Sequence, residues 1–245
     1  MDLDGRTILV TGASRGIGAA TARHLAGRGA RVGLMARDAA ALDALAAETG
    51  GVALPGDVAD WDAVAGAVDR LGAVDGLVNN AGLIDPIARI EDSDPAEWAK
   101  VVDVNLTGAY HALRAVLPGM RARGEGVVVN ISSGAATGAL EGWSHYCATK
   151  AALLSLTRCA HVELDGSGIH VVGLSPGTVA TDMQRSIKAS GVNPVSRLDW
   201  ERHIPPEWVA RAIGWLLEEG AARHAGTDFS LKTDEGRAAV GLPTG

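Results

Sequence analysis

Tyr146 and Lys150 lie four residues apart in the segment YCATK, a spacing that places both side chains on one face of a helix. A free tyrosine has a pKa of about 10 and exchanges protons poorly at neutral pH. A neighbouring ammonium group stabilises the phenolate, so the pair is a sensible acid–base unit. Ser133 lies thirteen residues before Tyr146, at the end of a predicted strand. It can donate a hydrogen bond to the carbonyl oxygen of a substrate with which the tyrosine exchanges a proton. Taken alone, the spacing is more typical of an ordinary helix-surface contact.

A glycine-rich segment, TGASRGIG at 11–18, joins a predicted strand to a predicted helix. Gly12 can make the tight turn out of the strand, Gly16 lets the backbone approach a pyrophosphate, and Gly18 lets the helix pack near the sheet. The start of the helix then offers free N–H groups and a positive dipole end to phosphates. The glycines alone could be structural, but the strand–turn–helix context predicts a dinucleotide site.

The second predicted strand ends in LMAR at 34–37 and carries no carboxylate at its tip. In dinucleotide folds, an acidic residue there binds the ribose 2′-hydroxyl of NAD and repels the 2′-phosphate of NADP. Asp38 comes only after Arg37, and Arg15 lies in the glycine segment, so two guanidinium groups can hold a 2′-phosphate. We expect NADP(H) to be preferred, with NAD(H) possible. The alternative is that both arginines are solvated surface residues.

Short apolar runs alternate with helical patterns along the whole chain. The runs span residues 7–10, 31–35, 52–54, 76–78, 127–131, 170–174 and 227–231. Such runs are typical of a parallel sheet buried between two layers of helices. No composition break divides the sequence. We therefore expect a single α/β domain over residues 1–245, with a Rossmann-type doubly wound sheet of seven parallel strands flanked by helices on both faces.

The stretch at about 180–206 departs from this alternation, because Gly191, Pro194 and the pair Pro205–Pro206 interrupt any long helix. It follows the sixth predicted strand, and ligands of doubly wound folds bind beyond the carboxyl ends of the strands. The stretch is therefore a candidate substrate lid. A surface loop without a function is the alternative.

Composition and charge exclude several classes of protein. The net charge is −7, and no run of Lys or Arg supplies the basic face of a general nucleic-acid binder. We expect no membrane span and no secretory signal, because no apolar run is long enough. Cys147 and Cys159 are twelve positions apart on one predicted helix, so we expect reduced thiols and a cytoplasmic location. The seven histidines lack the paired spacing of a zinc site, so we expect no metal.

Further motifs complete a pattern that resembles the short-chain dehydrogenase/reductase family over essentially the whole chain. The matching features are TGASRGIG at 11–18, NNAG at 79–82, Asn105 within VNLTG, Ser133, the YxxxK pair Tyr146 and Lys150, and Pro176–Gly177 followed by Thr181. Chance agreement of all these motifs in the same order is negligible.

The resemblance implies a role for each matching residue. Tyr146 would exchange a proton with the substrate oxygen, and Ser133 would orient that oxygen. Lys150 would hold the nicotinamide ribose and lower the tyrosine pKa, while Asn105 would support a water leading to Lys150. The residues expected at the cofactor are Gly12, Ser14, Arg15, Gly16, Ile17, Gly18, Arg37, Asp57, Val58, Asn80, Ala81, Gly82, Tyr146, Lys150, Pro176, Gly177, Val179 and Thr181.

The resemblance also implies an NADP(H)-dependent oxidoreductase that interconverts a small ketone or aldehyde and an alcohol. A 3-oxoacyl thioester reductase is the close alternative, although no compact basic cluster for an acyl carrier protein is visible. A non-catalytic NADP(H)-sensing or scaffold protein is the alternative from another class. Helices near 98–120 and 144–164 match those that associate in family dimers and tetramers, so a homodimer or homotetramer is expected.

An apolar substrate pocket is expected near the same edge of the sheet. Its candidate residues are Ile84, Trp143, Val179, Met183 and Trp200, and ordinary core or lid packing is the alternative for each. The chain departs from many family members at 228–236, where DFSLKTDEG replaces the usual aspartate and glycines after the last strand.

Overall fold

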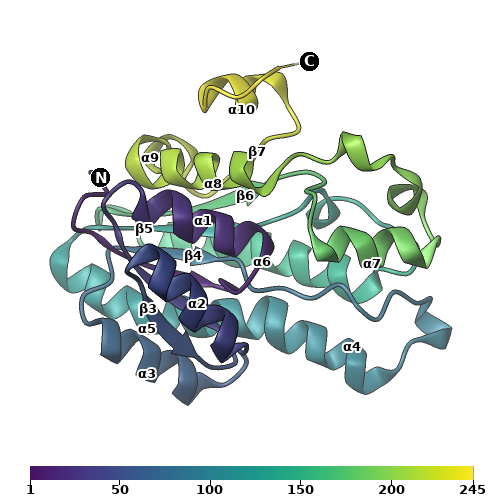
Figure 1. Ribbon diagram of the computed structural model, residues 1–245, viewed down its shortest axis with the longest axis horizontal. Helices are drawn as coiled ribbons and strands as arrows, with labels where there is room; N and C mark the ends of the chain where they lie inside the picture. Colours follow the sequence, from purple (N-terminus) through teal and green to yellow (C-terminus); the bar gives the residue numbers. More distant parts are fainter. Residues whose placement is uncertain (245) are drawn as a thin grey trace.

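The computed structural model describes residues 1–244. Its centre is a sheet of seven parallel strands in the order β3-β2-β1-β4-β5-β6-β7, which confirms the predicted Rossmann-type fold (Figure 1). The strands are β1 (Thr7–Thr11), β2 (Arg31–Ala36), β3 (Val52–Pro55), β4 (Gly76–Asn79), β5 (Gly126–Ile131), β6 (Ile169–Ser175) and β7 (Asp228–Ser230). Each predicted apolar run overlaps one of these strands, and no end differs by more than one residue.

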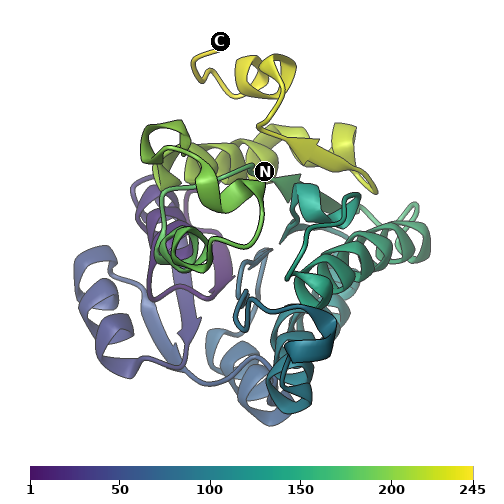
Figure 2. The same ribbon diagram turned by 90° about the vertical axis from the view of Figure 1, so that its right-hand side faces the viewer.

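Helices cover both faces of the sheet (Figures 1 and 2). Leu25 and Ile213 belong to the apolar core on one face, whereas Val64 and Val116 belong to the core on the other. The first layer holds α1 (Gly16–Ala26), α2 (Ala39–Thr49) and α8 (Pro206–Trp215), and the second holds α3 (Trp61–Leu71), α5 (Gly108–Arg123) and α6 (Ser144–Glu163). The remaining helices are α4 (Pro95–Val102), α7 (Asp182–Ser190), α9 (Ala221–His224) and α10 (Asp234–Ala239).

Local sequence explains where several helices begin and end. The carboxylates of Asp38, Asp60 and Asp94 accept hydrogen bonds from backbone N–H groups in the first turns of α2, α3 and α4. These carboxylates satisfy donors that would otherwise have no partner in the helix. Gly50 and Gly124 end α2 and α5 in the left-handed conformation that favours glycine. Local capping thereby sets the lengths of the helices that flank the loops at the edge of the sheet.

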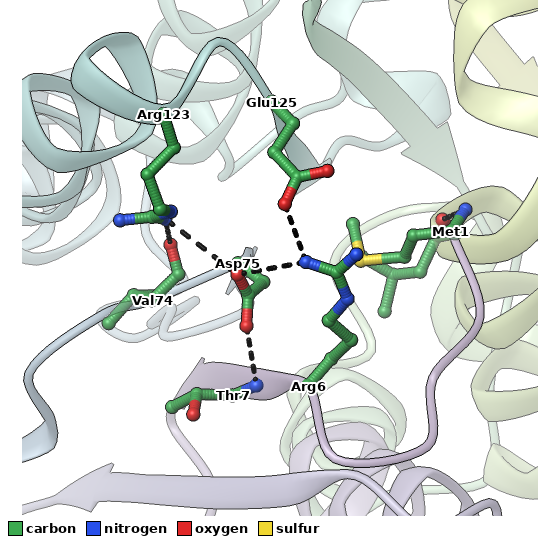
Figure 3. A network of polar contacts seen from close by, with 8 residues as sticks. Met1, Arg6, Thr7, Val74, Asp75, Arg123 and Glu125 are labelled. Carbon is green, nitrogen blue, oxygen red and sulfur yellow. Dashed lines mark hydrogen bonds and ion pairs between the residues drawn. The ribbon is translucent and has the colours of Figure 1, made fainter.

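A polar network ties the amino ends of the central strands together (Figure 3). Arg6 Nη1 lies 2.6 Å from Glu125 Oε1 and 3.4 Å from Asp75 Oδ1. The other oxygen of Asp75 accepts a hydrogen bond from the Thr7 N–H at 2.9 Å. Because Thr7 opens β1, Asp75 precedes β4 and Glu125 precedes β5, the network fixes these strands at the edge opposite the predicted site.

The stretch 180–206 contains α7, followed by two short 3-10 turns at Pro194–Arg197 and Trp200–Arg202. Gly191 ends α7 in the left-handed conformation, as the sequence predicts for an interrupted helix. A β-bridge between Val179 and Ile204 closes the base of the stretch. The segment is therefore a folded excursion anchored at both ends.

Candidate active site

A cavity of about 1130 Å³ lies beyond the carboxyl ends of the strands. It is lined by residues from the loops that follow all seven strands, since parallel strands end at the same edge. Its volume is slightly above the range of about 300–1,000 Å³ that is usual for ligand pockets, so an extended ligand fits. Every predicted catalytic and cofactor residue lines this cavity except Gly18 and Asn105, which are buried beside it.

The glycine turn forms a cradle at one end of the cavity. Gly12 and Gly16 have φ values of +64° and +55°, in the left-handed region that favours glycine. A Cβ on Gly18 would overlap the carbonyl oxygen of Gly12, so α1 can approach the turn only with glycine there. Asn80 Nδ2 braces the turn by donating to the carbonyls of Thr11, at 3.0 Å, and of Gly12, at 3.1 Å. These residues fit the pyrophosphate of a dinucleotide, which would meet the first N–H groups of α1.

Two arginines reach the cavity, each close to a carboxylate. Arg37 Nη1 lies 3.8 Å from Asp57 Oδ2, and Arg15 Nη1 lies 3.7 Å from Asp182 Oδ2. Both ion pairs are long and solvent-exposed, so each stabilises the folded chain little. Both guanidinium groups can therefore exchange their carboxylate for a stronger anion.

Tyr146 belongs to the first turn of α6 and has 9% of its surface exposed. Its ring packs edge-on against Trp143, with centroids 5.5 Å apart, and its hydroxyl hydrogen-bonds the Ser133 side chain. Lys150, one turn later on α6, holds its Nζ 5.6 Å from the centroid of the tyrosine ring. The fold thus brings Ser133, Tyr146 and Lys150 together on one wall of the cavity.

Burial raises the pKa of Tyr146 to about 12, because desolvation of the phenolate outweighs the lowering by the hydrogen bond from Ser133. The net shift of the tyrosine pKa is therefore upward and not downward as expected, because burial outweighs the effects that favour the phenolate. Burial also lowers the pKa of Lys150 to about 8, and the charge of Asp228 opposes this shift. The phenol is consequently protonated at neutral pH and suited to donate a proton.

Lys150 interacts with two groups that the sequence analysis missed, the carbonyl of Ile131 and the carboxylate of Asp228. Its Nζ donates a hydrogen bond to the carbonyl of Ile131, the last residue of β5, at 2.7 Å. Asp228, at the start of β7, accepts a hydrogen bond from Ser132 Oγ at 3.1 Å. Burial raises the pKa of Asp228 to about 6, although Ser132 and Lys150 both oppose this. Asp228 comes close to Lys150 because β7 pairs with β6, and no local sequence motif predicts this position.

Asn105 lies in a π-helical segment, Asp103–Thr107, between α4 and α5. Its Oδ1 accepts from the Leu83 N–H at 2.7 Å, and its Nδ2 donates to the Leu83 carbonyl at 2.9 Å. Nδ2 also lies 3.2 Å from Thr149 Oγ1 on α6. The side-chain amide therefore joins the loop after β4 to the helix that carries Tyr146 and Lys150.

The apolar part of the cavity lies between the tyrosine and α7. Four of its predicted members, Ile84, Trp143, Val179 and Met183, line the cavity, and the sequence analysis missed Leu140, Ile187, Val195 and Leu198. The prediction for Trp200 was wrong. Its ring lies under the guanidinium of Arg185, 5.0 Å from the centroid, and edge-on to His203, so it packs within the excursion and does not line the cavity.

No group of three or more His, Cys, Asp or Glu side chains is arranged to hold a metal ion among residues 1–244. None of the helices described is long and apolar enough to cross a membrane. Cys147 and Cys159 are both free thiols.

Comparison with known proteins identifies the family. The family signature described as short chain dehydrogenase matches residues 6–191. L-rhamnose 1-dehydrogenase (NAD(P)(+)) of Azotobacter vinelandii is 40% identical and covers 94% of this chain and 96% of its own. Cis-4-hydroxycyclohexanecarboxylate dehydrogenase of Sinomonas cyclohexanicum is 37% identical, with 96% and 97% covered.

A solved structure of a related reductase supports the same family assignment. The 3-oxoacyl-[acyl-carrier protein] reductase of Brucella melitensis, crystallised with bound NAD, is 32% identical and superimposes with a TM-score of 0.83. The match covers 94% of this chain and 90% of that one. The chain therefore belongs to the short-chain dehydrogenase/reductase family and is an NAD(P)-dependent oxidoreductase that acts on alcohol and carbonyl groups.

Proposed function

We propose that the protein uses NADP(H) to interconvert a ketone or aldehyde and an alcohol, with Tyr146 as the general acid and base. The observation that carries this proposal is the buried Tyr146 hydroxyl, hydrogen-bonded to Ser133 and close to Lys150, in the same cavity as the glycine turn. Loss of any of these three side chains would have favoured a non-catalytic sensor or scaffold, and all three are present.

Reduction of a carbonyl group requires a hydride at carbon and a proton at oxygen. When bound, the nicotinamide cofactor supplies the hydride. Tyr146 donates its proton to the substrate oxygen as negative charge develops there, and Ser133 holds that oxygen by a hydrogen bond. The positive charge of Lys150 stabilises the phenolate left on Tyr146. In the oxidative direction, the same tyrosine accepts the proton of the alcohol.

The preference for NADP(H) rests on Arg37 and Arg15. Their guanidinium groups flank the cavity next to the loops after β2 and β1, and both are held only by long ion pairs. A 2′-phosphate offers charge-assisted, bidentate hydrogen bonds that these carboxylate contacts do not. The relative from Brucella melitensis contains NAD, and the one from Azotobacter vinelandii is named for both cofactors, so relatives leave this preference open.

A 3-oxoacyl thioester reductase is the second candidate function. It is favoured by relatives of that name, such as the 3-oxoacyl-[acyl-carrier-protein] reductase of a Synechocystis species, 35% identical over 94% of this chain. Other relatives are named for sugars and cyclic alcohols. Oxidation of NADPH with simple ketones, aldehydes and acetoacetyl thioesters as substrates separates the two functions. No NADPH oxidation with any of them would instead support the non-catalytic alternative.

We also propose that residues 180–206 act as a substrate lid, because Met183 and Ile187 of α7 face the cavity wall formed by Trp143 and Tyr146.

We further propose that the protein forms a homodimer or homotetramer through α4, α5 and α6. Two exposed apolar side chains on these helices, Tyr110 and Val162, support this proposal. Light scattering of the purified protein measures the oligomeric state. The two free thiols are consistent with a reducing cytoplasmic compartment.

A further inference from the structure

One side of the cavity is lined by three basic side chains that the proposed chemistry does not use. Lys232 follows β7, Arg237 belongs to α10, and Arg202 ends the second 3-10 turn of the excursion. These residues come from separate elements, so the fold gathers them and no sequence motif does. All three bring a positively charged group to the cavity lining.

The Lys232 side chain lies along the loops that follow β6 and β5. Its Cγ would lie 3.1 Å from a Cβ placed on Gly177, so the glycine leaves room for the lysine stem beside the loop after β6. Its Nζ would lie 3.4 Å from a Cβ placed on Gly134, the residue next to Ser133. The ammonium group is therefore beside Gly134, in the loop after β5 that also carries Ser133.

Arg237 is held firmly, whereas Arg202 has a fixed backbone. Arg237 Nε donates to the carbonyl of Leu231 at 2.9 Å, and its guanidinium lies 5.8 Å from the centroid of the Trp208 ring. Arg202 stands two residues before Ile204, whose N–H donates to the Thr178 carbonyl at 3.0 Å. The Arg237 guanidinium is therefore fixed at the cavity, whereas for Arg202 only the nearby backbone is held, beside the loop after β6.

The acidic residues of the cavity do not neutralise these three charges. Asp57 and Asp182 lie beside Arg37 and Arg15, at the glycine-turn end. Asp38 caps α2, and Asp85 is exposed on the loop after β4. Within residues 1–244, none of the four carboxylates that line the cavity forms an ion pair with Lys232, Arg202 or Arg237.

We propose that the substrate carries an acidic group, such as a carboxylate, close to its reacting carbonyl, and that Lys232 binds it with help from Arg202 and Arg237. This inference rests on the proposed carbonyl reduction. The opposite wall, with Ile84, Trp143 and other apolar side chains, accommodates the rest of the molecule. The substrate class is therefore a short oxo acid with an apolar body.

A charge-assisted hydrogen bond at this site should favour the acid over its uncharged ester by about tenfold or more in kcat/KM. The test measures NADPH oxidation with acetoacetate, levulinate and the methyl ester of each. Lys232→Met is compared with Lys100→Met, which removes the same charge from α4, outside the cavity. We expect the acid-to-ester ratio to fall about tenfold in Lys232→Met and to stay unchanged in Lys100→Met.

Acetoacetyl-CoA is included because its phosphates lie far from its carbonyl. Equal kcat/KM for each acid and its ester in the unmodified protein would overturn the inference, and so would a preference for acetoacetyl-CoA that Lys232→Met leaves intact. A rise in the Kd of NADPH in Lys232→Met, with an unchanged acid-to-ester ratio, would also overturn it by assigning Lys232 to the cofactor. If none of the ketones, acids and esters is reduced, the proposed carbonyl reduction itself is wrong. If they are reduced but the acids are not preferred, only the inference about the acidic group is wrong.

Discussion

Lys150 Nζ lies 5.6 Å from the centroid of the Tyr146 ring and is hydrogen-bonded to the carbonyl of Ile131 at 2.7 Å. The ammonium group is thereby fixed between the tyrosine and the end of β5. With a pKa of about 8, Lys150 is mostly charged at neutral pH and loses its charge as the pH rises through that value. We therefore expect carbonyl reduction to slow above about pH 8, because the phenolate then loses its neighbouring positive charge.

Asp228→Asn should move this alkaline decline to lower pH. The carboxylate is charged above a pH of about 6, and its negative charge raises the pKa of Lys150. Without that charge, the pKa of Lys150 falls further below its usual value, so the ammonium is lost at lower pH. The measurement is kcat/KM for reduction as a function of pH.

Asp69→Asn, on the exposed face of α3, is the matched control and should leave the profile unchanged. A lower rate in Asp228→Asn with an unshifted profile would mean that Asp228 acts only through folding. Such a result would remove it from the description of the site.

Gly18→Ala should weaken cofactor binding and the fold together. The new methyl group would overlap the carbonyl of Gly12, so the glycine turn must shift, at a cost of about 1–3 kcal/mol in unfolding free energy. Denaturant unfolding and titration with NADPH measure both effects. Gly66→Ala on α3 makes the same change in open space and should stabilise the fold by about 0.5–1 kcal/mol. Equal behaviour of the two variants would contradict the close approach of α1 to the turn.

Arg37→Ala should lower kcat/KM for NADPH by about tenfold or more and change the value for NADH little, because only NADPH has the 2′-phosphate. Arg70→Ala, an exposed arginine of α3, controls for the loss of one surface charge. A higher kcat/KM with NADH than with NADPH in the unmodified protein would refute the proposed preference.

The sequence predicted the fold and most of the site because their signals are local. Strand positions follow from apolar runs, and the glycine turn from its own spacing. Lys232 and Asp228 were missed because they lie near Gly134 and Ser132, about a hundred residues earlier in the chain, only after β7 pairs with β6. Trp200 was misplaced because a large apolar residue in an irregular stretch can pack on a neighbouring side chain as well as face a cavity.

The expectation of a lowered tyrosine pKa was wrong for a different reason. The sequence shows that a lysine lies one turn away, and this argues for a lowered value. It does not show how deeply α6 buries Tyr146, and burial raises the pKa to about 12. Spacing therefore predicts which two residues form the proposed catalytic pair, whereas their protonation depends on tertiary packing.

Tyr146→Phe tests the central claim most directly. The phenyl ring keeps the packing against Trp143 and removes only the hydroxyl that we propose as the proton donor. We predict that kcat for carbonyl reduction falls by about 10²–10⁴-fold while the Kd of NADPH changes little, and that Tyr110→Phe, an exposed tyrosine on α5, retains full activity. Turnover by Tyr146→Phe within a few-fold of the unmodified protein would contradict the account, because the proton would then come from another group.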